Sequence, residues 1–342
     1  MSLKSLSALS ILTAFVLFGA LTMVATDQDF GPAAGVDEAA IPGLLEKIND
    51  VRKIIIEHSG GKITLTSNEG DWAVKEASGY TARTAKIKRV VLGLAQLKLS
   101  EPKTRLKSNY SKLELLDPNT KESKSKRVQL LDGRGRTIGN IIVGKRRPSI
   151  SGATSGGIYI RNPNKSQTWL AEGDVDISKN ITEWVERKIV NLNSKRVKKV
   201  IIRHADGEIL EVSKETPEES LFSLQSIPVH KKIASKTEPS TIGKALENLV
   251  LDDVKKEAGA PQLDVAKSLI ADFTTFDGLA IRLHLFNQDE RFWIIIEASG
   301  EHKDASIITK RTKGWVYQIA DYSASILTRR MNDLVENVKP KS

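Results

Sequence analysis

The chain has 342 residues and no cysteine, and its 52 Lys and Arg outnumber 42 Asp and Glu to give a formal net charge of +10 at pH 7. The lack of cysteine excludes disulfides, cysteine-bound zinc and thiol chemistry. The basic surplus would attract anionic partners such as lipid head groups, acidic polymers or an acidic protein face. Lysine and arginine also solvate ordinary surfaces, so the charge alone does not identify a partner.

An uncharged apolar run occupies residues 6–25 near the amino terminus. It is long enough to cross the core of a bilayer as a helix. Lys4 precedes the run, and Asp27 and Asp29 follow it, which favours a cytoplasmic amino terminus. The alternatives are a cleaved signal peptide, for which the end of the run makes a poor cleavage site, and a buried helix of a soluble domain. We therefore expect residues 1–26 to be a transmembrane anchor.

Residues 27–50 include a stretch that is rich in Gly, Pro and Ala. This composition argues against packing, so the segment is expected to be a tether between the anchor and the folded part. The residues that follow are enough for two domains of ordinary size, each able to bury a core.

A repeated pattern organises the rest of the chain. One copy begins at Val51 and the other at Val197, and each contains a basic strand that ends in histidine, at His58 or His204. A glycine-containing turn and a returning strand follow the histidine in both copies. We therefore predict two similar modules: residues 51–194 and residues 195–342.

The first module is predicted to open with three strands, because residues 51–57, 62–67 and 72–75 carry strand-like patterns. A pair of glycines between the first two strands is typical of a hairpin turn. The clearest helix of the chain follows. Its apolar residues recur at helical spacing: Ile87, Val90, Val91, Leu94 and Leu97.

Beyond this helix, a short helix is expected before Pro118, and then two strands joined by a turn at Asp132. Residues 157–162 and 167–173 are predicted to make a further strand pair. A closing helix is expected over residues 181–190.

In the second module, strands are predicted on both sides of Asp206, a long helix over residues 240–259, several strands over residues 273–299, and a strand with a final helix over residues 313–338. Turns of Gly-Gly or Asp-Gly type between apolar runs favour antiparallel pairing over parallel winding. The predicted fold class is α+β. It consists of an N-terminal transmembrane helix followed by two similar modules, each a mainly antiparallel twisted sheet with helices packed on one face.

Several segments of the chain resemble a bacterial family with a domain of unknown function, the family numbered 4340. The resemblance extends from about Val51 to the carboxyl end. It rests on residues 79–105, 109–115, 143–147, 157–177, 184–190, 197–208, 246–254, 273–279 and 314–319. Many members of that family are membrane-anchored and resemble auxiliary components of ABC-type transport systems linked to gliding motility. The resemblance implies a single-pass protein of a bacterial inner membrane with a periplasmic C-terminal part, and it brings no catalytic residue.

Two glycine patterns imitate nucleotide-binding loops without matching them. Residues 139–146 have the spacing of a phosphate loop, but Arg146 stands where Ser or Thr should bind magnesium, and the β-branched interior predicts a strand. Residues 133–139 are one residue too long for a dinucleotide fingerprint. His58 and His204 lack a third metal ligand. We therefore predict no catalytic, cofactor-binding or metal-binding residue and no cofactor.

The most promising contact surface is a cluster of basic residues around a Gly- and Ser-rich loop. Lys145, Arg146 and Arg147 stand at the end of a predicted strand, and Arg161 lies on the next strand. Cations beside flexible backbone could bind a phosphate or a carboxylate group. An ordinary solvated hairpin gives the same pattern, so both interpretations stay open.

These observations favour a protein that acts by binding. The expected function is an accessory or scaffold subunit of an ABC-transporter-like assembly, with an integral-membrane partner. The alternative is a periplasmic module that binds an anionic envelope polymer or lipid. A nucleic acid is not an expected partner. The protein is not expected to be an enzyme, the remaining possibility being an unrecognised hydrolase.

Overall fold

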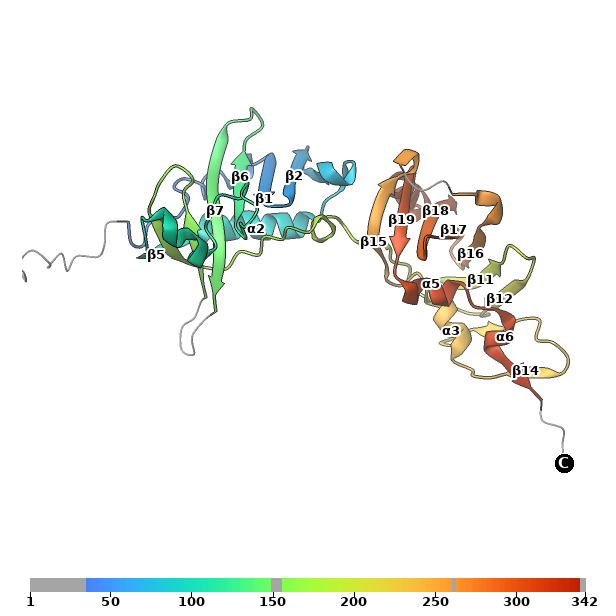
Figure 1. Cartoon of the computed structure of the whole chain (residues 1–342). Coiled ribbons are helices and arrows are strands. Elements are labelled where there is room, and N and C mark those ends of the chain that lie inside the picture. Colours follow the sequence, from blue (N-terminus) through green and yellow to red (C-terminus); the bar gives the residue numbers. More distant parts are fainter. Residues whose placement is uncertain (1–34, 149–155, 260–262, 339–342) are drawn as a thin grey trace, which may run out of the picture. The chain divides into compact units, whose positions relative to one another are not determined.

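The computed structural model describes residues 35–148, 156–259 and 263–338. They divide into two compact units (Figure 1). The first unit comprises the residues up to Lys62 together with Lys88–Lys179, and the second comprises Ile63–Ile87 together with Asn180–Ser342.

The first unit is built on an antiparallel sheet in the strand order β1-β6-β7-β8-β9-β5. Inward and outward residues alternate along β1, where Ile54 and Ile56 are fully buried. This alternation is what a strand with one covered face requires. The strands of this unit are β1 (Lys53–His58), β5 (Lys98–Pro102), β6 (Lys126–Leu131), β7 (Thr137–Arg147), β8 (Gly157–Arg161) and β9 (Thr168–Glu172).

The second unit contains an antiparallel sheet in the order β10-β15-β19-β18-β17-β16-β11-β12-β13 and a small separate pair, β14 and β20. Its strands are β10 (Lys188–Val190), β11 (Val197–Arg203), β12 (Ile209–Ser213), β13 (Ser223–Leu224), β14 (Lys231–Ile233), β15 (Leu249–Lys256), β16 (Leu269–Thr275), β17 (Leu279–Gln288), β18 (Arg291–Gly300), β19 (Trp315–Ile319) and β20 (Val335–Asn337).

The two sheets share one strand order. The series β1-β6-β7-β8-β9-β5 in the first unit corresponds, strand for strand, to β11-β16-β17-β18-β19-β15 in the second. Chain order corresponds as well. In each unit the last strand of the series comes from an earlier part of the chain than its neighbour: β5 lies beside β9, and β15 lies beside β19. Each position in one sheet therefore has a counterpart in the other.

An early segment of the chain belongs to the second unit. It contains most of β2 (Gly61–Asn68), together with β3 (Asp71–Val74) and β4 (Tyr80–Thr81). Tyr80 is 2% exposed, and its ring lies edge-on to Trp315, with ring centroids 4.9 Å apart. The second unit is thus completed by residues that precede most of the first.

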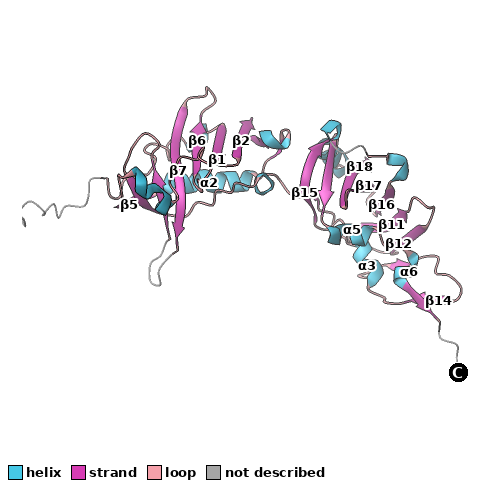
Figure 2. Ribbon diagram, in the orientation of Figure 1, coloured by secondary structure: helices cyan, strands magenta, loops and turns pink. Residues whose placement is uncertain are grey.

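Helices are few among the described residues, and strands dominate the fold (Figure 2). The helix predicted after the third strand is confirmed as α2 (Thr84–Gln96), with Ile87, Val90 and Leu94 buried. The other α-helices are α3 (Glu238–Gly243), α4 (Asp304–Thr312), α5 (Asp321–Leu327) and α6 (Met331–Leu334). The 3-10 helices are η1 (Ile48–Asp50), η2 (Lys75–Ala77), η3 (Lys107–Leu113), η4 (Ile181–Glu183), η5 (Glu257–Gly259) and η6 (Val265–Lys267).

The predicted α+β class is therefore wrong, since the structure consists mainly of two large antiparallel sheets with few helices. The clearest error is the long helix expected over residues 240–259, where α3 ends at Gly243 and β15 follows. Leu249, Leu251 and Val254 are all buried, because a bulge between Leu251 and Asp253 shifts the register of β15. A bulge replaces the strict period of two by uneven spacing, which imitates a helical pattern.

Two closing helices were also predicted where the structure has shorter elements. Residues 181–190 form η4 and the strand β10, and the carboxyl-terminal residues form α5, α6 and β20. Trp184 is fully buried within the first of these segments. A single bulky apolar residue of this kind fits a strand or an irregular segment as well as a helix. The periodicity of the sequence therefore did not distinguish a helix from these structures.

No helix in the described ranges is long and apolar enough to span a membrane. The predicted anchor, residues 6–25, lies outside these ranges. The described part of the expected tether packs onto the first unit. The Asp37 backbone N–H donates to the carbonyl of Leu99 at 2.7 Å, the Ala40 N–H donates to the carbonyl of Leu97 at 2.8 Å, and Leu44 is fully buried.

Candidate functional site

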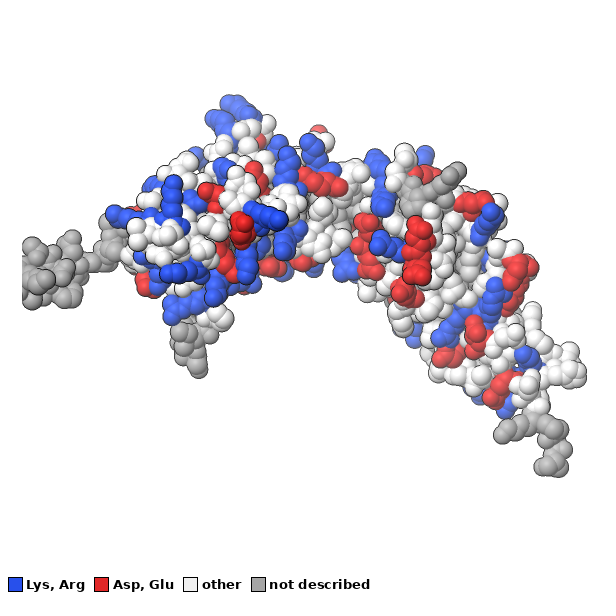
Figure 3. Space-filling view, viewed as in Figure 1, with Lys and Arg blue, Asp and Glu red and all other residues white. Residues whose placement is uncertain are grey.

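The three consecutive cations predicted as a contact surface lie at the exposed end of β7. Lys145, Arg146 and Arg147 all expose their side chains. Figure 3 shows Lys and Arg gathered where β7 ends, with acidic side chains among them. Arg146 contacts two of these, since its Nη2 lies 2.7 Å from Asp174 Oδ1 and 4.0 Å from Asp176 Oδ1. Part of the charge at this end of β7 is therefore already balanced.

Arg161 does not belong to this exposed cluster. Its side chain is only 5% exposed, and its Nη2 donates to Asp117 Oδ1 at 2.7 Å. The same nitrogen lies 3.3 Å from the carbonyl of Leu115, and the guanidinium stacks over the ring of Tyr110 at 4.7 Å. The register explains this placement, because Arg161 pairs with Ile142, well before the cationic end of β7. The expectation that all four cations are exposed together is wrong for Arg161, which holds η3 and the following loop against the sheet.

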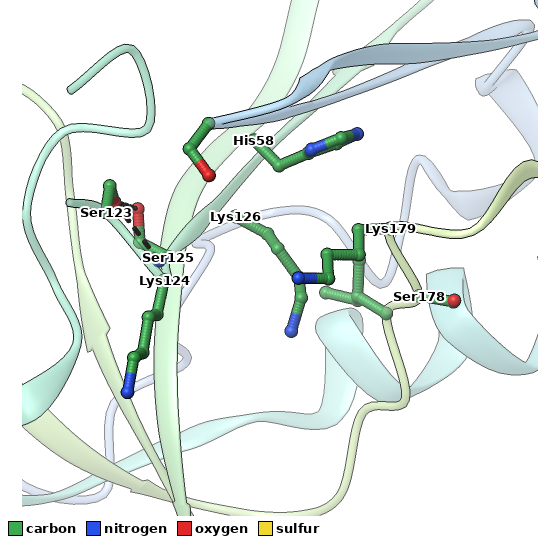
Figure 4. A pocket seen from close by; sticks show the side chains of 9 residues that line it. His58, Ser123, Lys124, Ser125, Lys126, Ser178 and Lys179 are labelled. Atoms are coloured by element: carbon green, nitrogen blue, oxygen red, sulfur yellow. Dashed lines mark hydrogen bonds between the residues drawn. The ribbon is translucent and has the colours of Figure 1, made fainter. Parts of the chain in front are cut away.

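A pocket of about 380 Å³ opens in the first unit at the end of β1 and the start of β6. Its third wall is the segment that follows β9. Figure 4 shows Lys126 and Lys179 reaching toward one another below the ring of His58, whereas Lys124 points away from them. The lining residues are three lysines, one histidine, four serines and one isoleucine: Lys124, Lys126, Lys179, His58, Ser59, Ser123, Ser125, Ser178 and Ile177.

The sheet register places His58 opposite Lys126. Glu57 pairs with Arg127, so one further step along both antiparallel strands brings His58 and Lys126 together. The charged form of Lys126 is disfavoured. Burial lowers the pKa of its ammonium group, and the nearby positive charges of Arg146 and Lys179 lower it further. Glu114 and Asp176 act in the opposite direction without cancelling this effect.

His58 provides one hydrogen-bond donor, the N–H at Nε2. The Gly60 backbone N–H donates to His58 Nδ1 at 3.1 Å, so the proton of the neutral ring must lie on Nε2. The neutral form is favoured, since burial lowers the pKa of His58 and the charges of Lys179 and Lys126 lower it further. The site therefore combines ammonium groups with one neutral N–H donor.

The two buried serines of the pocket already use their hydroxyl protons. Ser125 Oγ donates to the carbonyl of Leu116 at 2.6 Å, and Ser123 Oγ lies 3.2 Å from the same oxygen. These bonds fix the chain just before Lys126. Ser123 and Ser125 therefore shape the pocket, while Lys126, Lys179 and His58 provide donors to it.

The counterpart of this pocket in the second unit is built differently. Arg203 pairs with Ile270, so His204 lies opposite Leu269 as His58 lies opposite Lys126. His204 is 8% exposed, and its Nε2 lies 3.1 Å from the carbonyl of Arg329. Corresponding positions of the two sheets thus carry a lysine in the first unit and a leucine in the second. Setting the two repeats side by side in the sequence would have revealed Lys126, which inspection for motifs did not.

One set of residues in the second unit resembles a hydrolytic triad in composition. His284 lies between Ser268, 3.2 Å from its Nδ1, and Glu297, 4.0 Å from its Nε2. However, Ser268 Oγ donates its proton to the carbonyl of Val265 at 2.7 Å, so His284 Nδ1 has to donate to the hydroxyl oxygen. A histidine in that role cannot take a proton from the serine, so this arrangement does not activate a nucleophile.

The described residues contain no group of three or more His, Cys, Asp or Glu that could hold a metal ion. His58 and His204, the pair considered from the sequence, lie in the two different units. The structure therefore places a cationic pocket near the predicted basic residues Lys145, Arg146 and Arg147. It does not place Arg161 with these three residues.

Comparison with known proteins gives one match. The comparison with curated proteins and the comparison with solved structures each found no match. The model of the family described as a domain of unknown function, DUF4340, matches residues 72–267. This match covers more than half of the 342 residues and includes strands of both units. The chain therefore belongs to the DUF4340 family.

Proposed function

We propose that this protein acts by binding, and that its first unit holds an anionic group in the pocket between Lys126 and Lys179. The observation that carries the proposal is the difference between the two repeats at one position. Leu269 occupies in the second sheet the place of Lys126 in the first, so the shared fold does not require a cation there. A half-buried lysine with a lowered pKa costs stability, and such residues are often retained for function.

The surroundings of the pocket support an anion as the ligand. The lining contains no Asp or Glu, and three of its residues are lysines: Lys124, Lys126 and Lys179. Positive charge in a concave site concentrates an anion and speeds its capture. The anionic group could belong to an envelope polymer, a lipid or a smaller molecule.

Replacing Lys126 by leucine, the residue of the second unit, tests this function. We expect K126L to lose roughly tenfold or more of its affinity for inorganic phosphate, because one of two converging ammonium groups is removed. The same change should raise the free energy of unfolding by about 1 kcal/mol, since a desolvated charge is replaced by an apolar side chain. Isothermal titration calorimetry at low ionic strength and urea unfolding would measure the two effects.

The matched control for K126L is K165L. Lys165 is exposed on the turn between β8 and β9, so its loss removes the same charge away from the pocket. Its affinity for phosphate should stay within about twofold of the wild type. Unchanged binding by K126L, or failure of the wild type to bind any anion tested, would refute the proposed function.

A second candidate function concerns the wider assembly. The resemblance of the sequence to auxiliary components of ABC-type transport systems suggests an accessory subunit in a bacterial inner membrane, with residues 1–26 as its anchor and the rest in the periplasm. The exposed cations Lys145, Arg146 and Arg147 support contact with an acidic face of a membrane protein. Exposed charges of this kind act mainly on the rate of encounter.

Charge reversal tests this contact. The double variant R146E/R147E should recover less of its membrane partners than the wild type at low salt, and the difference should shrink above about 0.15 M salt, where the Debye length falls to about 8 Å. Quantitative pull-down from solubilised membranes at several salt concentrations would measure it. Equal recovery with equal salt dependence would show that the end of β7 is an ordinary solvated surface.

A further inference from the structure

We infer that the group bound in the pocket of the first unit is a terminal phosphate monoester, a dianion with three free oxygens. This inference rests on the proposed function, because it names the ligand of the same site. It follows from the charge, the donors and the size of the pocket, taken in turn.

The charge of the pocket favours a ligand with two negative charges. Lys126 and Lys179 are close enough to affect one another, and both line a pocket whose lining has no Asp or Glu. Arg146 also lies near Lys126, but its charge is paired with Asp174. Among the described residues neither lysine has a salt-bridge partner, although Glu114 and Asp176 lie near enough to raise the pKa of Lys126 in part. A carboxylate or a phosphodiester carries one charge and leaves part of this repulsion uncompensated. A phosphate monoester near neutral pH carries between one and a half and two negative charges, by the second pKa of about 6.

The hydrogen-bonding groups favour a ligand that only accepts. The ammonium groups of Lys126 and Lys179 and the Nε2–H of His58 are all donors. Ser123 and Ser125 direct their hydroxyl protons to the carbonyl of Leu116, away from the ligand. A terminal phosphate offers three strong acceptor oxygens to such a set. A carboxylate offers two.

The size of the pocket leaves room for more than the phosphate itself. A volume of about 380 Å³ lies in the lower part of the range for small-molecule sites. Ile177, which is 5% exposed, provides an apolar contact in the same wall as Lys179. The phosphate is therefore expected at the end of a small organic group, such as a phosphorylated sugar or glycerol, or the head group of a lipid.

A pair of ligands with the same shape and different charge provides the test. Methyl phosphate and methyl sulfate both present a methyl group on a tetrahedral oxyanion, but only the phosphate can carry two charges. Calorimetric titration of the full chain at pH 7.5 and low ionic strength should show methyl phosphate binding roughly tenfold or more tightly than methyl sulfate. The preference should disappear in K126L and persist in the control K165L.

Vesicles then distinguish the two sources of a phosphate monoester. Phosphatidic acid carries a monoester, whereas phosphatidylglycerol carries a diester with one charge. If the ligand is a lipid, the full chain should co-sediment more with phosphatidylcholine vesicles containing phosphatidic acid than with vesicles containing phosphatidylglycerol at equal surface charge, and K126L should remove the difference. A free phosphorylated molecule as ligand predicts the methyl phosphate preference without any difference between the two vesicles.

The possible results separate the inference from the function on which it rests. Equal affinities for methyl phosphate and methyl sulfate, both lost in K126L, would overturn the phosphate assignment and leave anion binding intact. Failure of every anion to bind would overturn both. A preference for methyl phosphate that survives in K126L would place the phosphate site elsewhere and likewise refute the inference.

Discussion

Replacing Gly144 by alanine should destabilise the first unit by up to about 3 kcal/mol, as overpacking of a rigid site does. A Cβ at Gly144 would lie 2.4 Å from the carbonyl oxygen of Leu113 and 2.7 Å from that of Glu114. Both contacts are with backbone, so relief requires η3 and the residues after it to move away from β7. Urea unfolding monitored by tryptophan fluorescence would measure the loss.

The effect of G144A should reach the site as well as the stability. Gly144 immediately precedes the exposed cations of β7, and Leu115 supplies a carbonyl to Arg161. The control is G133A on the turn between β6 and β7, where the new Cβ would be 3.5 Å from Arg52, an ordinary contact. We expect G133A to stay within about 0.5 kcal/mol of the wild type. A G144A protein as stable as this control would show that η3 does not rest on β7.

Replacing Arg161 by methionine should cost about 2–3 kcal/mol of stability. Methionine keeps much of the volume and removes the charge-assisted bond to Asp117, the contact with the carbonyl of Leu115 and the stacking on Tyr110. Each charged hydrogen bond lost from a buried site is worth about 1.5–3 kcal/mol, and the carbonyl left behind loses its partner. Chemical unfolding of R161M would measure the total.

Arg146 provides the comparison for Arg161. Its side chain is 48% exposed and pairs with an Asp174 that is itself 79% exposed. Such surface pairs contribute little, so R146M should change the free energy of unfolding by no more than about 0.5 kcal/mol. If R146M proved as damaging as R161M, the assignment of one arginine to the fold and the other to the surface would be wrong.

Much of the strand arrangement could be predicted from the sequence, for a physical reason. In β1 and β6 buried and less buried residues alternate, and a short turn follows each strand, so local pattern and final pairing agree. The failures lie where a bulge changes the spacing. In β15 the pattern of Leu249, Leu251 and Val254 depends on a register shift that only the partner strand β19 defines. Such a register shift is a property of two paired strands, so the sequence of one strand does not predict it.

The candidate site was likewise predicted only in part from the sequence. Lys145, Arg146 and Arg147 could be found because adjacent cations at a strand end stay exposed in any packing. Arg161 was misjudged because Asp117 and Tyr110, its partners, come from a segment whose path the sequence did not define. The pocket was missed because its residues His58, Lys126 and Lys179 are distant in sequence. They meet only through the register of β1 with β6 and the path of the segment that follows β9.

The early segment of the second unit has a consequence for synthesis. Tyr80 leaves the ribosome 315 − 80 = 235 positions before Trp315, the ring that it packs against. At about 5–20 residues per second, translation leaves this tyrosine and its strand without that partner for roughly 10–50 s. Most of the first unit can close during the same interval, since its strands end at Glu172. The nascent chain therefore carries Tyr80 without its ring partner while most of the first unit can already fold.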